Sequence, residues 1–288
     1  MAIYLGDTAI KKVYLGATEI KKIYQGTTLL YSSFTYDPDL LTYIDSLVTP
    51  LSEGQLALLN TFIVNLKSGL SIANLSDAFD VMYILAGETA ESSLRNMVKR
   101  AFDATVVNSP TFTALEGFTG SSSPLRHINL NFNPTANGTI ISQNDICVMW
   151  GIGNDVSEAY YDIGGKDAAG VFLFSRANSG GTATFRCNDA TNAGTANTNT
   201  IKHYAMSRGN ALNYDSYINL SKSNKLVTST GLLNIDMGAC CYNNVGTFAG
   251  CNKQLRYVFI FKYLTEAQVT IVTNAVEAYL DSNEKGLM

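Results

Sequence analysis

The segment "LRYVFIFKYLTEAQVTIVTNAVEAYL", residues 255–280, decides the fold because it joins a strand pattern to a helix pattern. Its first ten residues are rich in aromatic and β-branched side chains, which is typical of a β-strand. Thr265 then stands at a helix N-cap position, and Gln268 follows at the spacing of a capping box. We therefore expect a strand followed directly by a closing helix. The apolar residues of that helix share one face: Val269, Val272, Val276 and Leu280.

Short apolar runs of the same strand type fill residues 106–264, a region rich in glycine, asparagine and threonine. Many short strands separated by turn signals predict an antiparallel β-sandwich (jelly roll, concanavalin-like) over 106–288. The polar stretch 188–200 is expected to be a mobile surface loop. The candidate strands are TFTALEGF, HINLNF, DICVMWGIG, GVFLFSR, ATFRC, HYAMSR, DSYINL, LVTS and LRYVFIFKYL. The turn signals are Asn133-Pro134, Gly164-Gly165, Gly180-Gly181 and Ser223-Asn224.

Between residues 33 and 105 the apolar period becomes helical, which predicts a helical connector module and an α+β fold class. In "PLSEGQLALLNTFIVNLKSG", residues 50–69, Ser52 is the expected N-cap and Gln55 its capping-box partner. Gly69 is the expected C-cap. Further helices are expected over 40–48, 91–98 and the mostly apolar, hence buried, 76–86.

Three decapeptides of one pattern, IYLGDTAIKK, VYLGATEIKK and IYQGTTLLYS, open the chain within residues 1–32. They predict three short strands separated by tight turns. Over 10–15 neither strand face is cleanly apolar, so this unit needs a surface to pack on. That surface is either the downstream domain or, as we favour, another chain that pairs with it by strand addition. The candidate assembly residues are Ile3, Tyr4, Gly6, Val13, Tyr14, Gly16, Ile23, Tyr24 and Gly26.

Composition limits the classes of function. The 288 residues are 46% hydrophobic and 15% charged, with a formal net charge of -4, so no basic field favours nucleic-acid binding. No apolar run reaches the roughly 18 residues that span a bilayer. The charged N-terminus lacks the apolar stretch of a secretion signal. We therefore expect neither nucleic-acid binding nor membrane insertion.

Metal and cofactor patterns are weak in this sequence. With only two histidines and no paired cysteine spacing, a zinc site is not expected. Asp189 and Asn192 lack the alternating oxygen ligands of a calcium loop. We expect no cofactor and no metal. Buried free thiols, in a protein made in a reducing cytoplasm, are the favoured interpretation of the five cysteines: Cys147, Cys187, Cys240, Cys241 and Cys251.

Catalytic patterns are weak as well. Glu116 and Glu158 are the only glutamates of 106–264, and neither has an aspartate two residues away, as a strand-borne glycosidase pair would. A pair assembled from different strands stays open. No G-x-S-x-G motif occurs, and His127 and His203 lie in strand-like surroundings. We expect no catalytic residues, with a glycan hydrolase as the alternative, and no glycan-binding pocket can be assigned.

The chain resembles the fibre and decoration proteins of tailed bacteriophages in three places. The opening repeat is similar to a tag with hydrophobic-Tyr-x-Gly-x-[TS]-x-[IV]-K-K units. Residues 46–99, "SLVTPLSEGQLALLNTFIVNLKSGLSIANLSDAFDVMYILAGETAESSLRNMVK", resemble a recurrent module of phage fibre proteins. Residues 255–280 are similar to the strand and helix that close a concanavalin-like (laminin-G-like) domain.

This resemblance implies a virion surface protein: a short head or tail fibre, or a capsid decoration, made in the cytoplasm of a bacterial host. Its expected partners are the capsid, collar or baseplate through residues 1–32, and further copies of itself, with a homotrimer favoured. A carbohydrate-facing sandwich and the lack of universal catalytic residues are also implied. A polysaccharide depolymerase on the same fold and a purely structural virion adaptor are the alternatives.

Overall fold

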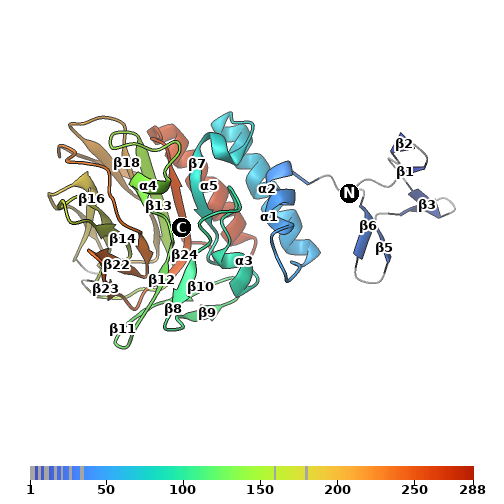
Figure 1. Cartoon of the computed structure of the whole chain (residues 1–288), viewed down its shortest axis with the longest axis horizontal. Coiled ribbons are helices and arrows are strands. Elements are labelled where there is room, and N and C mark those ends of the chain that lie inside the picture. The colour runs from blue at the N-terminus through green and yellow to red at the C-terminus, as the bar shows by residue number, and fades with distance from the viewer. Residues whose placement is uncertain are drawn as a thin grey trace. The chain divides into compact units, whose positions relative to one another are not determined.

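The structure is a computed structural model that describes residues 36–158, 160–178 and 181–288, together with six short strands within residues 1–35. The chain divides into two compact units, Met1–Pro38 and Asp39–Met288. Among the described residues, the first unit holds short two-stranded hairpins, and the second holds a β-sandwich covered on one side by helices (Figure 1).

The first unit contains three separate two-stranded antiparallel hairpins, one from each decapeptide. The registers Leu5↔Thr8, Leu15↔Thr18 and Gln25↔Thr28 leave two residues between paired strands, and the sequence places glycine first in each of these connections. The prediction of one strand per repeat is therefore wrong: each period of ten residues supplies two strands, which pair with each other. The strands are β1 (Tyr4–Leu5), β2 (Thr8–Ala9), β3 (Val13–Leu15), β4 (Thr18–Ile20), β5 (Lys22–Gln25) and β6 (Thr28–Ser32).

Two sheets form the sandwich of the second unit. An eight-stranded sheet has the order β20-β19-β18-β13-β24-β10-β9. Its eighth strand, β7, lies off this linear order and pairs with β24. Its long central pair is β13 (Ile146–Ile152) and β24 (Gln254–Phe261). The remaining strands are β7 (Phe79–Tyr83), β9 (Thr111–Thr113), β10 (Gly117–Thr119), β18 (Lys202–Arg208), β19 (Tyr214–Ile218) and β20 (Ser221–Lys225).

The second sheet has ten strands, with β11-β12-β21-β14-β15-β16-β17 as its main path. All its pairings are antiparallel except β14 with β22. The predicted antiparallel sandwich is thus confirmed. The strands are β8 (Thr105–Val107), β11 (Ser121–Ser122), β12 (Leu125–Asn129), β14 (Ile163–Lys166), β15 (Phe172–Arg176), β16 (Gly181–Asp189), β17 (Ala193–Asn197), β21 (Gly238–Ala239), β22 (Cys241–Asn244) and β23 (Thr247–Gly250).

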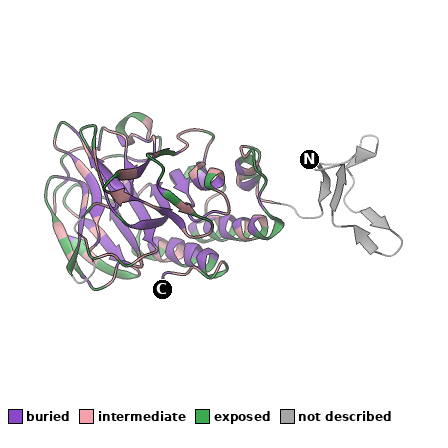
Figure 2. Cartoon of the chain, turned by 90° about the horizontal axis from the view of Figure 1, so that it is seen from below, coloured by how far each residue is buried: buried purple, intermediate pink, exposed green. Residues whose placement is uncertain are grey.

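The hydrophobic core lies between the two sheets, and Figure 2 shows buried residues following them. Trp150 of β13 stacks on Tyr204 of β18 with ring centroids 5.6 Å apart, and Phe185 of β16 approaches from the other sheet at 6.1 Å. All three side chains are almost fully buried. Burial of each such ring stabilises the fold by about 1.5–3 kcal/mol relative to leaving it exposed.

Helices cover the other face of the eight-stranded sheet (Figure 1). Phe62 of α2 contacts Phe259 of β24 at 6.2 Å and Tyr279 of α5 at 5.8 Å, so both helices share the aromatic outer face of β24. The helices are α1 (Pro38–Ile44), α2 (Glu53–Leu70), α3 (Ala90–Leu94), α4 (Pro134–Asn137) and α5 (Glu266–Asp281), with a 3-10 turn at Leu75–Asp77.

By length and composition alone, the segment Glu53–Asp77, which contains α2, could cross a membrane, a test that core helices of soluble proteins also pass. One stripe of α2 packs on α5 and β24, and Lys67 in its last turn pairs with Asp39 at 3.0 Å. We therefore interpret α2 as a core-facing helix of this layer. Its buried residues are Gln55, Leu59, Phe62, Ile63, Leu66 and Leu70.

The helix caps agree with the sequence only in part. The predicted capping box of α5 is confirmed, because Thr265 Oγ1 accepts from the Gln268 amide and Gln268 Oε1 accepts from the Thr265 amide. Ser52 Oγ caps α2 by accepting from the Gln55 amide at 3.3 Å. The Gln55 side chain, however, accepts a hydrogen bond from the Tyr279 hydroxyl of α5 instead of completing the capping box. The C-cap prediction at Gly69 is wrong, because α2 runs on to Leu70.

Gly69 has a packing role instead of a capping one. A Cβ at this position would lie 2.5 Å from Ile271 Cγ2, so glycine lets α2 approach α5 closely. Ser71 ends the helix in the left-handed conformation, with φ of 56°. The predicted helices at 40–48 and 91–98 exist but are shorter, as α1 and α3.

Several sequence predictions outside the caps are wrong. The Ser223-Asn224 turn signal lies inside β20, and the predicted strand LVTS, residues 226–229, is not a strand. Residues 78–86 are buried, as expected, but the segment holds strand β7 instead of a helix. The stretch 188–200 contains β17, which pairs with β16. Gly164-Gly165 lies inside β14 and not at a turn, and a Cβ on Gly164 would come within 2.0 Å of the Leu173 carbonyl oxygen of β15.

Candidate functional site

Strand alternation exposes one set of side chains on the outer face of the ten-stranded sheet. In β15, Leu173 points into the core, so its neighbours Phe172 and Phe174 point outward. Register adds Lys166 of β14 opposite Phe172, and Arg186 of β16 opposite Phe174. We call this set the aromatic-cationic face: Tyr161, Lys166, Phe172, Phe174, Arg176, Arg186 and Tyr242.

The rings of this face pack against one another in a layer. Tyr161 stacks on Tyr242 with centroids 4.4 Å apart, and its edge meets Phe174 at 4.9 Å. Phe174 meets Tyr242 at 5.4 Å. Within this layer Phe174 and Tyr242 are buried, whereas Tyr161 is half-buried, as is the neighbouring Phe172.

Cations lie over these rings. The Arg186 guanidinium carbon is 3.9 Å from the centroid of Phe172, and Lys166 Nζ is 5.2 Å from the same ring. Arg186 Nε donates to Asn192 Oδ1 at 2.7 Å, which fixes the guanidinium. Stacking on a ring leaves the in-plane Nη donors of a guanidinium free to meet a carboxylate or phosphate.

The face carries positive charge without internal neutralisation. Within the described part of the chain, no carboxylate forms an ion pair with Lys166, Arg176 or Arg186. Asp189, the acid at the end of β16, is fully buried and pairs with Arg208 at 3.4 Å. Burial raises the pKa of Asp189, although hydrogen bonds from the Cys187 and Thr191 amides oppose that shift.

A buried ion pair holds the strands of the face in place. Lys253 Nζ donates to Asp162 Oδ1 at 2.5 Å, and both side chains are fully buried. Asp162 immediately precedes β14, and its other carboxylate oxygen accepts from the Ala177 amide, just beyond β15, at 2.7 Å. The pair therefore joins the two ends of the β14–β15 hairpin to the segment that leads into β24.

The sequence-predicted carboxylates are both engaged elsewhere. Glu116 pairs with Lys285 at 2.6 Å, and the hydrogen bond from Lys285 lowers the pKa of Glu116, which makes this carboxyl a poor proton donor at neutral pH. Glu158 accepts from the backbone and side-chain amides of Asn252, at 2.7 and 2.8 Å. Neither carboxylate lies on the aromatic-cationic face.

The two histidines are both buried in strands. His203 bridges Tyr257, whose hydroxyl lies 2.8 Å from Nδ1, and Glu277, whose Oε2 lies 2.7 Å from Nε2. His127 stacks on Phe248 at 4.3 Å, and burial lowers the pKa of its imidazole. In the described part of the chain, neither imidazole forms a hydrogen bond with a serine hydroxyl or a cysteine thiol.

The thiols and the calcium candidates have structural roles. All five cysteines are free and buried, as predicted. Burial raises the pKa of the Cys187 and Cys240 thiols to about 12. Asn192 accepts a hydrogen bond from Arg186, and Asp189 forms an ion pair with Arg208. The described residues contain no group of three His, Cys, Asp or Glu side chains that could hold a metal ion.

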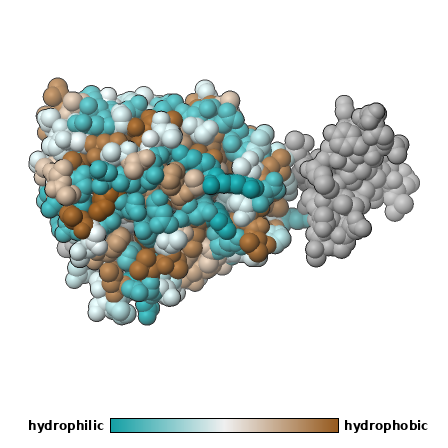
Figure 3. Space-filling model, viewed as in Figure 1, coloured by the Kyte–Doolittle hydropathy of each residue, from teal (hydrophilic) through white to brown (hydrophobic). Residues whose placement is uncertain are grey.

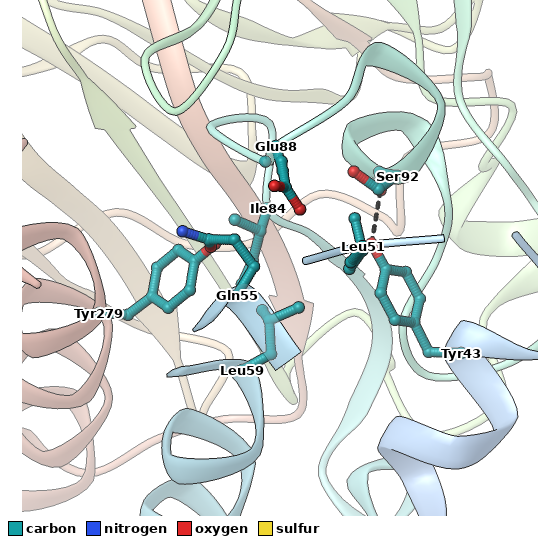
Figure 4. Close-up of a pocket in the computed structure, with 9 residues that line it drawn as sticks. Tyr43, Leu51, Gln55, Leu59, Ile84, Glu88, Ser92 and Tyr279 are labelled. Carbon is teal, nitrogen blue, oxygen red and sulfur yellow. Dashed lines mark hydrogen bonds between the residues drawn. The ribbon is translucent and has the colours of Figure 1, made fainter. Parts of the chain in front are cut away.

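A small cleft lies where α1, α2, α3 and α5 meet, and it has room for about one water molecule (Figure 4). Its polar groups pair with one another. The Tyr279 hydroxyl donates to Gln55 Oε1 at 3.1 Å, and the Tyr43 hydroxyl donates to the Ser92 carbonyl at 2.8 Å. We interpret this cleft as a junction of the helical layer and not as a ligand site.

The predicted assembly residues divide between described strands and positions outside them. Tyr4 lies in β1, Val13 and Tyr14 lie in β3, and Ile23 and Tyr24 lie in β5. The positions outside the described residues are Ile3, Gly6, Gly16 and Gly26.

No protein-family profile matches the chain, and no curated protein is similar to it in sequence. Solved structures do resemble it. The sialidase of Trypanosoma rangeli, in complex with 2,3-difluorosialic acid, is 11% identical over 81% of this chain and 40% of its own, with a TM-score of 0.52. At this identity the likeness shows the fold alone, which is a β-sandwich.

Two further structures overlap the sandwich with lower scores. Domain 4 of the extracellular arabinanase AbnA from Geobacillus stearothermophilus, solved with arabinotriose, is 12% identical over 68% of this chain and 98% of its own, with a TM-score of 0.43. The binding domain of botulinum neurotoxin serotype D is 14% identical over 69% of this chain, with a TM-score of 0.46. The chain spans about half of the toxin structure, and less of the sialidase.

Proposed function

We propose that this chain is a non-enzymatic virion protein of a tailed bacteriophage, a short fibre or capsid decoration that attaches to host-surface glycans. In this proposal residues 1–32 dock the protein to the particle, and the sandwich of the second unit faces the host. The resemblance of the opening repeat to phage structural tags supports the virion setting. The sandwich fold is compatible with glycan attachment.

The observation that carries the docking role is the isolation of the three hairpins. Among the described pairings, each of the six strands pairs only with its own hairpin partner. An isolated two-stranded hairpin is marginally stable in water, and its outer edges hold unpaired backbone donors and acceptors. Such edges suit strand addition to capsid, collar or baseplate proteins, or to copies of the same chain, for which we favour a trimer.

The docking role is tested by deleting residues 1–32 and measuring incorporation into particles. We expect the truncated protein to be absent from purified virions while the full chain is present. A thermal melt of both proteins controls for loss of the sandwich fold. Normal incorporation of a folded, truncated protein would exclude the docking role.

The attachment role is tested separately with the full chain on glycan arrays and on host cells. Binding to a defined glycan is expected. Release of reducing ends from host polysaccharide, lost on changing Glu116→Gln or Glu158→Gln, would instead support the depolymerase alternative. Binding to no glycan and no cell, with the sandwich buried against other virion proteins, would support the structural adaptor.

A further inference from the structure

The aromatic-cationic face combines two chemistries that one ligand class needs together. The half-buried Tyr161 offers ring surface, on which the C–H face of a sugar can lie, beside the Phe172 ring that carries Arg186. Lys166, Arg176 and Arg186 offer cations that form no ion pair with a carboxylate in the described part of the chain. On a chain with a formal net charge of -4, this local excess of cations indicates an anionic partner.

The geometry of the cations favours carboxylates. The Arg186 guanidinium is stacked on Phe172 and fixed by Asn192, so its Nη donors lie at the edge of the aromatic surface. A sugar bound beside this stacked pair would bring an attached carboxylate to that edge, where a guanidinium can bind both oxygens at once. Arg176 contributes a second guanidinium on the next outward position of β15, where Nη2 donates to Thr184 Oγ1 at 3.4 Å.

The face is built from rigid elements. Its residues stand on β14, β15, β16 and β22 or directly beside them, and the Asp162–Lys253 pair anchors the β14–β15 hairpin from below. Gly164 lets β14 approach Phe174 closely, since a Cβ there would meet Phe174 Cα at 2.6 Å. A site on strands loses less conformational entropy on binding than one on loops.

We propose that the aromatic-cationic face binds an acidic glycan, a polysaccharide with carboxylated sugars such as uronic or sialic acids. This inference rests on the proposed attachment function and names its surface and its ligand class. On the side of the molecule seen in Figure 3, hydrophobic residues form small groups separated by hydrophilic ones.

The test measures binding of the full chain to polygalacturonate, hyaluronate and oligosialic acid, each compared with its carboxyl-reduced form. We expect at least one acidic polymer to bind, with about tenfold weaker binding of its reduced form, because a charge-assisted hydrogen bond is lost. Raising the salt concentration should weaken the binding.

Variants locate the site. Arg186→Gln and the half-buried Lys166→Gln should each weaken binding to the acidic polymer by about threefold to tenfold, and Phe172→Leu should do so without a change of charge. Lys222→Gln is the matched control: it removes the same charge from β20 of the other sheet and should change the affinity by less than about twofold. A thermal melt of each variant checks its folding.

The outcomes separate this inference from the proposed function. Binding to neutral glycans alone would overturn the inference and leave glycan attachment standing. Binding to acidic glycans that Arg186→Gln, Lys166→Gln and Phe172→Leu do not weaken would place the site elsewhere. Equal binding of oligo-dT at matched charge would assign the face to polyanions in general. Binding to no glycan, acidic or neutral, would overturn the inference and the attachment role together.

Discussion

Replacement of Lys253 by methionine tests the buried ion pair beneath the candidate face. The Lys253 ammonium donates to Asp162 Oδ1 at 2.5 Å, to the Tyr160 carbonyl at 3.0 Å and to the Ala177 carbonyl, so all three of its hydrogens have acceptors. Methionine would fill similar volume but would leave these three acceptors without their donor. The Asp162 carboxylate would then be a buried charge without a cation.

The magnitude follows from complete burial of both partners. Removing one member of a buried ion pair costs about 3–5 kcal/mol, mostly because the other charge stays behind in a low-dielectric site. For a protein of this size that corresponds to a fall in melting temperature of about 6–20 °C. Surface ion pairs are worth at most about 1 kcal/mol, so the control Lys222→Met, from a partly exposed pair, should change little.

The assay is urea unfolding of the wild type, Lys253→Met, Asp162→Asn and the double variant. In the double variant the charge of Asp162 is removed as well, and its amide can donate to one of the carbonyls that Lys253 leaves. We therefore expect the double variant to be more stable than the sum of the single changes by at least about 1 kcal/mol. A loss below 1 kcal/mol for Lys253→Met, or strictly additive effects, would refute this account of the pair.

Three further predictions concern other buried groups. Burial raises the pKa of Glu277, but hydrogen bonds from His203 and two backbone amides outweigh burial, so the pKa lies below its usual value of 4.5. The ionised Glu277 therefore stabilises the folded protein above pH 4.5, and this contribution is lost as the pH falls. Glu277→Gln should therefore cost about 2–4 kcal/mol at neutral pH in urea unfolding, and the difference should shrink in acid; an unchanged difference would exclude this ionisation. Gly164→Ala should destabilise the fold by at least about 2 kcal/mol, because φ is 117° and the new Cβ would clash with the β15 backbone. The control Gly170→Ala, at φ of 82° with open space around it, should cost about half as much in the same assay. The native thiols, with pKa values of about 12 at Cys187 and Cys240, should not react with a disulfide reagent until the protein unfolds, and rapid native labelling would contradict their burial.

Local sequence signals predicted the elements whose causes are local. The Thr265–Gln268 box placed the start of α5 correctly, because a cap depends on four neighbouring residues. The failure at 76–86 has a tertiary cause. β7 is buried on both faces, between the helices and the core, so its residues show no alternation that would mark a strand.

At two glycines, the sequence predicted a turn where the structure has a strand. Gly164 and Gly165 signal a turn in the sequence, yet they stand in β14 because the chain there passes close to its neighbours. The turn preference of glycine is a property of the residue, whereas close approach is a property of the packed sheet. Close approach, and not turn preference, also explains Gly69, where Ile271 of α5 occupies the space that a side chain would need.

The candidate site was beyond the reach of the sequence for a related reason. The alternation of Phe172, Phe174 and Arg176 is visible in the run GVFLFSR, but Leu173 and Ser175 between them do not reveal which face is the core. The partners Lys166 and Arg186 join the face only through strand register. Register between strands depends on the whole sheet, so no local pattern could assemble this set.

Because each decapeptide of the first unit closes its own hairpin, the pairing partner of every strand there lies within the same repeat. Gain or loss of ten residues would therefore add or remove one complete hairpin and shift no register in the others. The length of the opening segment can thus change in whole steps during evolution.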